Sequence, residues 1–174
     1  PNNENVGNVE ILNNKVYDIT RTGITNYPYT ECTSCKNYNV VIKHNEVYNT
    51  GRDTSSAGHG ILVKNNVENT IIECNNIYNT GSNNGHSIAI EGFTSIDPKY
   101  LTVRYNLLVD QIYISGVGDQ STFEINNNDQ TGGTIPPPFD PYCAQSFSAC
   151  SASDNNPEDD EVSMIELINY IGEY

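Results

Sequence analysis

The stretch that decides the fold is Val40-Val-Ile-Lys-His-Asn-Glu-Val-Tyr-Asn49, because the chain repeats its pattern. The same ten-residue pattern recurs at residues 9–18, 70–79 and 101–110, and a fifth, degenerate copy covers residues 123–128. Each copy has apolar residues at alternate positions, then an asparagine, then a second apolar group. The anchor asparagines are Asn14, Asn45, Asn75, Asn106 and Asn128, and the first four lie 31, 30 and 31 residues apart.

The alternation with period two predicts strands that bury one face. Each repeat also contains a second apolar burst, at residues 23–24, 60–63, 87–90 and 111–114. Repeats of about 30 residues made only of short strands and turns are typical of a solenoid. We therefore expect an all-β fold, a parallel β-helix of about five rungs that covers residues 1–133.

Two side-chain columns are expected to run along this solenoid. The anchor asparagines should form a ladder in which each amide donates to one neighbouring rung and accepts from the other, at a corner where asparagine tolerates a left-handed conformation. Tyr17, Tyr48 and Tyr78 occupy equivalent positions and should stack as parallel rings. Both columns are interpreted as structural.

The charge of the chain restricts its partners. The sequence has 22 acidic and 8 basic residues, a formal charge of −14, which argues against nucleic acid and against an anionic membrane surface. No stretch approaches the roughly 18 apolar residues of a membrane span. The chain starts at Pro1 within polar sequence, which indicates a processed protein or an excised piece. We expect an extracellular or cell-surface location.

The five cysteines are expected to form local disulfides. The close spacing favours the pairs Cys32–Cys35 and Cys143–Cys150, with Cys74 as the odd, buried residue. A zinc site would need a second close pair near residues 32–35, and the sequence has none there.

The motif Asn-x-Ile/Val-Tyr-Asn-Thr-Gly, at residues 45–51 and 75–81, resembles the repeats of pectate-lyase-like proteins. The resemblance covers roughly residues 6 to 130 and implies a right-handed parallel β-helix. It does not imply one activity, because that superfamily includes lyases, epimerases, hydrolases, phage tailspikes and adhesins.

The candidate catalytic residues are few. His59 and His86 occupy equivalent positions on adjacent rungs, and Lys64 and Arg104 are the only bases that a lyase mechanism suggests. The clustered aspartates of pectin hydrolases are missing, and the Asp-Pro-His motif of alginate epimerases is replaced by Asp97-Pro98-Lys99. Longer loops should project over the middle rungs near residues 52–58 and 82–85, where solenoids usually bind their ligands.

The carboxyl end differs from the repeats. Residues 134–153 are predicted to form a Pro-rich linker with a small cysteine loop, and residues 154–174 an acidic amphipathic helix. This end also resembles half of a dockerin-like calcium loop, which implies Asn155, Asp159 and Glu166 as Ca²⁺ ligands, although Pro157 and Asp160 depart from the motif. Calcium is the only cofactor that the sequence suggests.

We expect a non-catalytic structural β-helix that assembles head to tail with copies of itself, as a fibre or surface layer, because an uncovered rung is a template for another chain. One alternative is a carbohydrate-active fragment, a polysaccharide lyase or epimerase, with its site above His59 and His86. Another is a glycan-binding module that uses Tyr48, Tyr78 and the loops.

Overall fold

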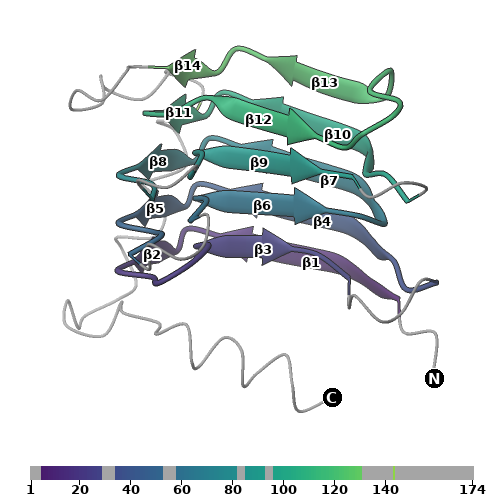
Figure 1. The fold of residues 1–174 in the computed structure, drawn as a ribbon, viewed down its shortest axis with the longest axis horizontal. Coiled ribbons are helices and arrows are strands. Elements are labelled where there is room, and N and C mark those ends of the chain that lie inside the picture. Colours follow the sequence, from purple (N-terminus) through teal and green to yellow (C-terminus); the bar gives the residue numbers. More distant parts are fainter. Residues whose placement is uncertain are drawn as a thin grey trace.

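The structure is a computed structural model, and it describes residues 5–28, 34–52, 58–81, 85–92, 96–130 and 143. These residues form a stack of parallel strands in which the chain climbs one rung per repeat, from the purple strands to the green ones in Figure 1. The predicted parallel β-helix is confirmed. The predicted helix at 154–174, the calcium candidates and most of the predicted linker lie outside the described residues.

Three parallel sheets make up the faces of the stack. Sheet A consists of β1 (Val6–Leu12), β4 (Asn37–Lys43), β7 (Val67–Glu73), β10 (Lys99–Arg104) and β13 (Phe123–Asn126). Sheet B consists of β2 (Lys15–Tyr17), β5 (Glu46–Tyr48), β8 (Asn76–Tyr78), β11 (Leu107–Leu108) and β14 (Asp129–Gln130). Sheet C consists of β3 (Ile24–Asn26), β6 (Ile61–Lys64), β9 (Ile88–Glu91) and β12 (Ile112–Ser115).

The register places like residues on like. Ile42 pairs with Ile72 and Ile72 with Val103, and Val47 pairs with Ile77. These side chains point into the stack and are 0–1% exposed. Because β-branched residues pack well on a pleated surface, one thin core runs continuously through the middle rungs.

The anchor asparagines line the corner between sheets A and B. The amide of Asn45 donates to Oδ1 of Asn75 at 3.0 Å, and its backbone N–H donates to the same oxygen at 2.9 Å. The amide of Asn75 makes the matching bond to Asn106 at 2.9 Å, and its second proton reaches the carbonyl of Ile42 on the preceding rung. Asn14 and Asn128 extend this column, which we call the inner ladder, to both ends of the stack.

The left-handed residue of each corner is the one that precedes the ladder asparagine. Positive φ angles of 52–59° occur at the residue before each ladder asparagine, and the ladder asparagines themselves do not have them. The column of left-handed residues is Asn13, His44, Cys74, Tyr105 and Asn127. This position tolerates varied side chains, whereas the ladder position requires an amide for its hydrogen bonds.

The cysteine pairing also differs from the expectation. Cys74 is buried as expected, but it forms a disulfide with Cys143, across 69 residues of sequence. The predicted Cys143–Cys150 pair is therefore wrong. Because Cys74 is the left-handed residue before Asn75, this disulfide fixes Cys143 beside the inner ladder. Cys35 is also disulfide-bonded, and its predicted partner Cys32 lies outside the described residues.

Candidate functional site

Three polar arrangements lie on the outside of the stack, and the first is an aromatic cluster beside sheet C. The rings of His59 and His86 stack with centroids 5.6 Å apart, and Tyr113 stacks on the other side of His86 at 4.4 Å. Nε2 of His59 lies 3.9 Å from Oε1 of Glu91, whose other oxygen lies 2.7 Å from Nζ of Lys64. The structure therefore brings together three of the predicted candidates, His59, His86 and Lys64.

His59 is held in one tautomer. Its Nδ1 accepts a hydrogen bond from the backbone N–H of His86 at 3.2 Å, so the ring proton of the neutral form sits on Nε2 and faces Glu91. Burial lowers the pKa of His59 below its ordinary value of 6.5, and the charge of Glu91 only partly opposes this. A neutral imidazole next to a carboxylate is chemically able to move a proton. However, the His59 side chain is only 6% exposed, so access to it is narrow.

Glu91 and Tyr113 were not among the residues predicted from sequence. The sequence contained an indication for Glu91: it lies 27 residues after Lys64, the same spacing that separates His59 from His86 on adjacent rungs. The sequence contained no such indication for Tyr113, because Tyr113 pairs in register with Ala89 and not with His86. Its ring reaches His86 over the small, fully buried Ala89.

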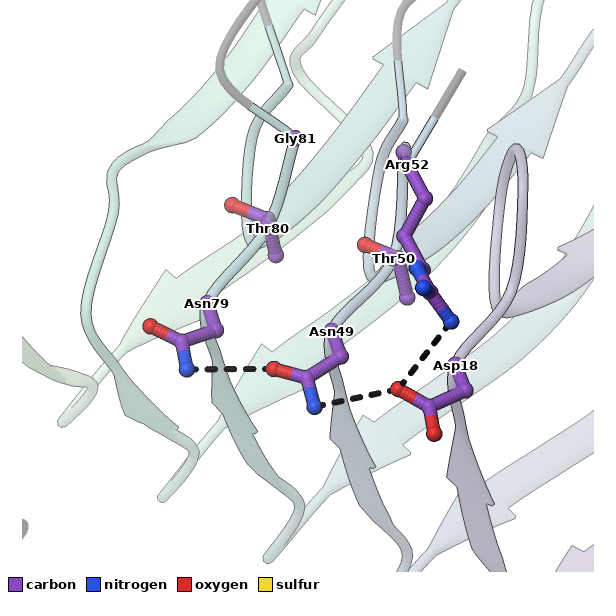
Figure 2. A pocket seen from close by; sticks show the side chains of 8 residues that line it. Asp18, Asn49, Thr50, Arg52, Asn79, Thr80 and Gly81 are labelled. Carbon is purple, nitrogen blue, oxygen red and sulfur yellow. Dashed lines mark hydrogen bonds and ion pairs between the residues drawn. The ribbon is translucent and has the colours of Figure 1, made fainter.

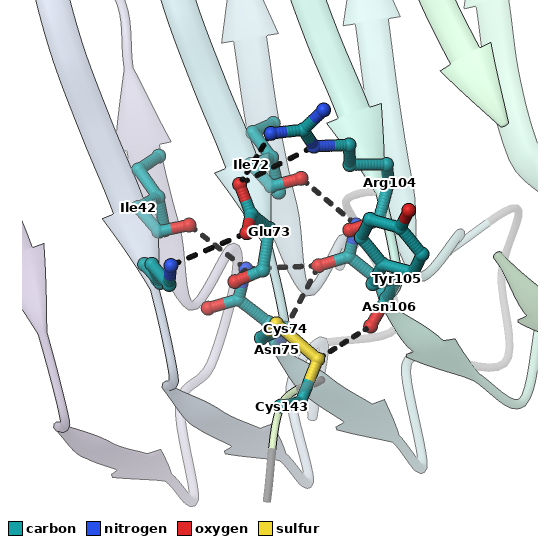
Figure 3. Close-up of polar contacts among 10 residues, drawn as sticks. Ile42, Ile72, Glu73, Cys74, Asn75, Arg104, Tyr105, Asn106 and Cys143 are labelled. Atoms are coloured by element: carbon teal, nitrogen blue, oxygen red, sulfur yellow. Dashed lines mark hydrogen bonds and ion pairs between the residues drawn. A yellow bond between two sulfur atoms is a disulfide. The ribbon is translucent and has the colours of Figure 1, made fainter. Parts of the chain in front are cut away.

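The second arrangement is a charged column on the outer face of sheet A, shown in Figure 3. Glu73 is buried, with its side chain 4% exposed. It lies between Lys43 on the preceding rung and Arg104 on the following rung. Its oxygens lie 3.2 Å from Nζ of Lys43 and 3.3 Å from Nη2 of Arg104. Arg104, predicted as a candidate base, is thus paired with Glu73 on a different sheet from His59.

His44 precedes the inner ladder close to this column. Its side chain is buried, and burial together with the nearby charge of Lys43 lowers its pKa below 6.5. The group of Lys43, Glu73, Arg104 and His44 is thus closely packed. It joins three successive rungs and leaves little surface for a substrate.

The third arrangement is a hollow of about 440 Å³ where the strands β2, β5 and β8 end. Figure 2 shows a row of side chains along its edge: the amide of Asn79 donates to Asn49 at 3.1 Å, and the amide of Asn49 donates to Asp18 at 3.2 Å. Nη1 of Arg52 lies 3.7 Å from the same oxygen of Asp18. We call the row Asp18, Asn49 and Asn79 the outer ladder. The sequence analysis did not select these residues.

Tyr17, Tyr48 and Tyr78 immediately precede the outer ladder along the chain. Their rings stack at 5.3 and 4.9 Å with nearly parallel planes, so most of each ring face is covered by the next ring. The hydroxyl of Tyr78 donates to Glu46 at 2.8 Å, and burial with this bond raises the pKa of Tyr78. This column holds rungs together rather than presenting a flat ring to a sugar.

In the described part of the chain, no group of three or more His, Cys, Asp or Glu residues is arranged to hold a metal ion. A search of the same residues finds no helix with the length and apolar character to cross a membrane. The calcium candidates at residues 155, 159 and 166 are not among them.

Comparison with known proteins gives one match. The model of a family described as disaggregatase related matches residues 6–135, which are 130 of the 174 residues. No curated protein and no solved structure matches the chain.

Proposed function

This chain belongs to the disaggregatase-related family, and from that premise we propose that it is a surface-associated, non-catalytic β-helix that stacks head to tail with copies of itself. The observation that carries the proposal is the complementarity of the two ends of the inner ladder. One end presents unused acceptors and the other presents unused donors.

The inner ladder follows one rule at every described step. Each ladder asparagine donates from its backbone and its amide to Oδ1 of the next rung, and its amide also donates to a carbonyl three residues before the previous ladder asparagine. Among the described residues, none donates to Oδ1 of Asn14 at the first rung, and none accepts from the backbone N–H of Asn128 at the last rung. Applied to two copies, the rule brings Asn128 of the lower copy to Asn14 of the upper one.

The same rule places the amide of the upper Asn14 against the carbonyl of Ile125 in the lower copy. A head-to-tail contact of this kind uses two different surfaces, so it repeats without closing and produces a filament. Within the described residues, the strands of the first and last rungs pair on one side only, and their outer edges carry backbone groups that a further rung would pair.

Apolar surface at both ends supports the same arrangement. Most inward side chains of the first and last rungs are only partly buried, with Ile24 of the first rung an exception, whereas those of the middle rungs are buried. The partly buried residues are Val9, Ile11 and Val16 at one end, and Ile112, Ile114, Val117, Phe123 and Ile125 towards the other. Stacking a second copy would bury these residues as the interior rungs bury theirs, a gain of about 25 cal/mol per Å².

The use of charge supports a non-catalytic role. Six of the eight basic residues form ion pairs with carboxylates, and each pair joins residues far apart in sequence. These basic side chains therefore pair with carboxylates of other rungs. They do not form a cluster that would neutralise the carboxylate of a uronate, the acidic sugar on which polysaccharide lyases act. The disulfide between Cys74 and Cys143 suits the oxidising environment of an extracellular location.

A charge placed at the end of the stack tests assembly. The variant Ile11→Lys puts a cation at the partly buried first rung and should leave monomers where the wild-type chain forms long particles, measured by sedimentation velocity and light scattering. Its matched control is Leu12→Lys, one residue along the same strand but pointing outward and 37% exposed, which should assemble normally. A wild-type chain that stays monodisperse and monomeric at high concentration would overturn the proposal.

A further inference from the structure

The hollow beside the outer ladder is built from polar groups that have hydrogen-bonding capacity left over. The amides of Asn49 and Asn79 each donate one N–H to the neighbouring residue of the ladder. A primary amide has a second N–H and further lone pairs, so each can form additional hydrogen bonds. Asp18 and Asn79 are exposed and Asn49 is half-buried, so these remaining groups face the hollow and water. The structure places alternating donors and acceptors along its edge, one rung apart.

Tightly packed glycines lie behind the hollow. Gly51 has a φ of +67°, and a Cβ there would lie 2.6 Å from the Cα atoms of Gly58 and Gly81, so the protein's own backbone fills this place. A ligand would therefore contact the polar side chains along the edge of the hollow and not the backbone of these glycines.

The lining selects the ligand by charge and polarity. Arg52 is the one cation among the lining residues, and Asp18 neutralises it at 3.7 Å. A net charge of −14 on the whole chain opposes a polyanion. The lining residues include no aromatic or aliphatic side chain larger than threonine. An uncharged ligand rich in hydroxyl groups fits these conditions.

We propose that this hollow binds a neutral glycan chain that lies across the ends of β2, β5 and β8, with its hydroxyl groups bonded to the outer ladder. Neighbouring rungs are about 4.8 Å apart, close to the length that one sugar ring adds to an extended glycan, so successive rings meet successive amides. The hollow opens where β2, β5 and β8 end, and only Asp18 belongs to the first rung, which the proposed head-to-tail contact also uses. Binding and assembly are therefore measured separately below.

The chain contains a matched control for this site. Asn8, Asn39 and Asn69 form a second exposed ladder with the same rung spacing, the same left-handed backbone and the same amide-to-amide bonds, at 3.1 and 3.2 Å. None of its members lines the hollow. Removing amides from this control ladder changes the surface chemistry equally, without touching the proposed site.

The test is isothermal titration of the full chain with neutral hexasaccharides of glucose, mannose, galactose and N-acetylglucosamine, and with hexagalacturonate. We expect at least one neutral hexasaccharide to bind. The double variant Asn49→Gly/Asn79→Gly, which keeps the left-handed backbone, should weaken its binding at least tenfold. The control variant Asn39→Gly/Asn69→Gly should bind as the wild type does.

Three outcomes would overturn the proposal: no neutral hexasaccharide binds, both double variants bind equally well, or hexagalacturonate binds more tightly than every neutral probe. Circular dichroism of each variant checks that the rungs remain folded. Light scattering on the same samples measures particle size, and therefore assembly, independently of glycan binding. Loss of glycan binding is thus distinguished from loss of stacking.

Discussion

The inner and outer ladders use the same residue at the same rung spacing in opposite ways. Asn45, Asn75 and Asn106 are 0–1% exposed, and their amides bond to the rungs on both sides. Asn49 and Asn79 repeat just as regularly four residues later, but they face a hollow that is open to water. Sequence periodicity alone does not distinguish the two columns.

Burial is what separates them. An inner amide has no water to replace a lost partner, so its hydrogen bonds become obligatory, whereas an outer amide exchanges partners at little cost. The inner ladder can therefore determine the rung geometry, and the outer one can bind a ligand without destabilising the stack. The predictions below test this contrast, from the largest expected effect to the smallest.

Removing an amide from the middle of the inner ladder should have the largest effect. Asn75→Ala removes the acceptor of the Asn45 backbone N–H and amide and the amide that donates to the carbonyl of Ile42, while the backbone N–H of residue 75 still donates to Oδ1 of Asn106. With about 1–3 kcal/mol for each unsatisfied buried group and some relaxation, we expect the free energy of unfolding to fall by about 3 kcal/mol. Urea denaturation followed by circular dichroism measures this. A loss below about 0.5 kcal/mol would mean that the ladder does not hold the rungs together.

The buried ion pairs of sheet A should come next. Glu73→Gln removes the carboxylate that Lys43 and Arg104 share, and these two cations lie on the rungs on either side of residue 73. Because both cations are about one-third exposed, we expect a loss of about 1–2 kcal/mol rather than the full cost of a buried unpaired charge. The control Asp18→Asn, in an exposed pair with Arg52, should change the unfolding free energy by less than about 0.5 kcal/mol. Equal losses in both variants would contradict this account.

The sequence repeat made most of the rung architecture and its side-chain columns predictable. Because the four gapless copies align Lys43, Glu73 and Arg104 as well as the asparagines, the alignment already contained the charged column, although Arg104 was interpreted as a base without its partner. The stacked tyrosines and the inward positions of the rungs follow from the same alignment.

The remaining features depend on contacts that break the repeat. The disulfide joins Cys74 to a residue beyond the last rung, and no spacing rule relates the two. Tyr113 reaches His86 only because Ala89 leaves space on the intervening surface. Gly51, Gly58 and Gly81 come from different turns and pack against one another, and the single sequence marks them only as turn residues.

Acidification should destabilise the stack through its buried histidines. Burial lowers the pKa of His59 and of His44 below 6.5, so the unfolded chain takes up protons more readily than the folded one. The stabilisation is complete above pH 6.5 and is lost as the pH falls below it towards the lowered folded values. Unfolding free energies at pH 7.5 and 5.5 should therefore differ.

The double variant His44→Asn/His59→Asn isolates this effect. Asparagine suits the left-handed position 44, where Asn13 and Asn127 stand on other rungs, and at position 59 its oxygen can accept the N–H of His86. We expect the pH dependence between 7.5 and 5.5 to be reduced in this variant. If it keeps the full wild-type dependence, carboxylates and not these histidines cause it.

The smallest effect is expected in the exposed control ladder, and it separates backbone from side chain. Asn69 has a φ of +55°, which glycine adopts freely and alanine does not. Asn69→Gly should therefore change the unfolding free energy by less than about 0.5 kcal/mol, while Asn69→Ala should lower it by about 1 kcal/mol.

Asn75, by contrast, is not one of the residues with a positive φ, so Asn75→Gly should destabilise the chain at least as much as Asn75→Ala. Urea denaturation of the four variants measures both comparisons. If glycine rescues position 75 but not position 69, the buried ladder is set by its backbone and the exposed one by its amides, the reverse of the arrangement argued above.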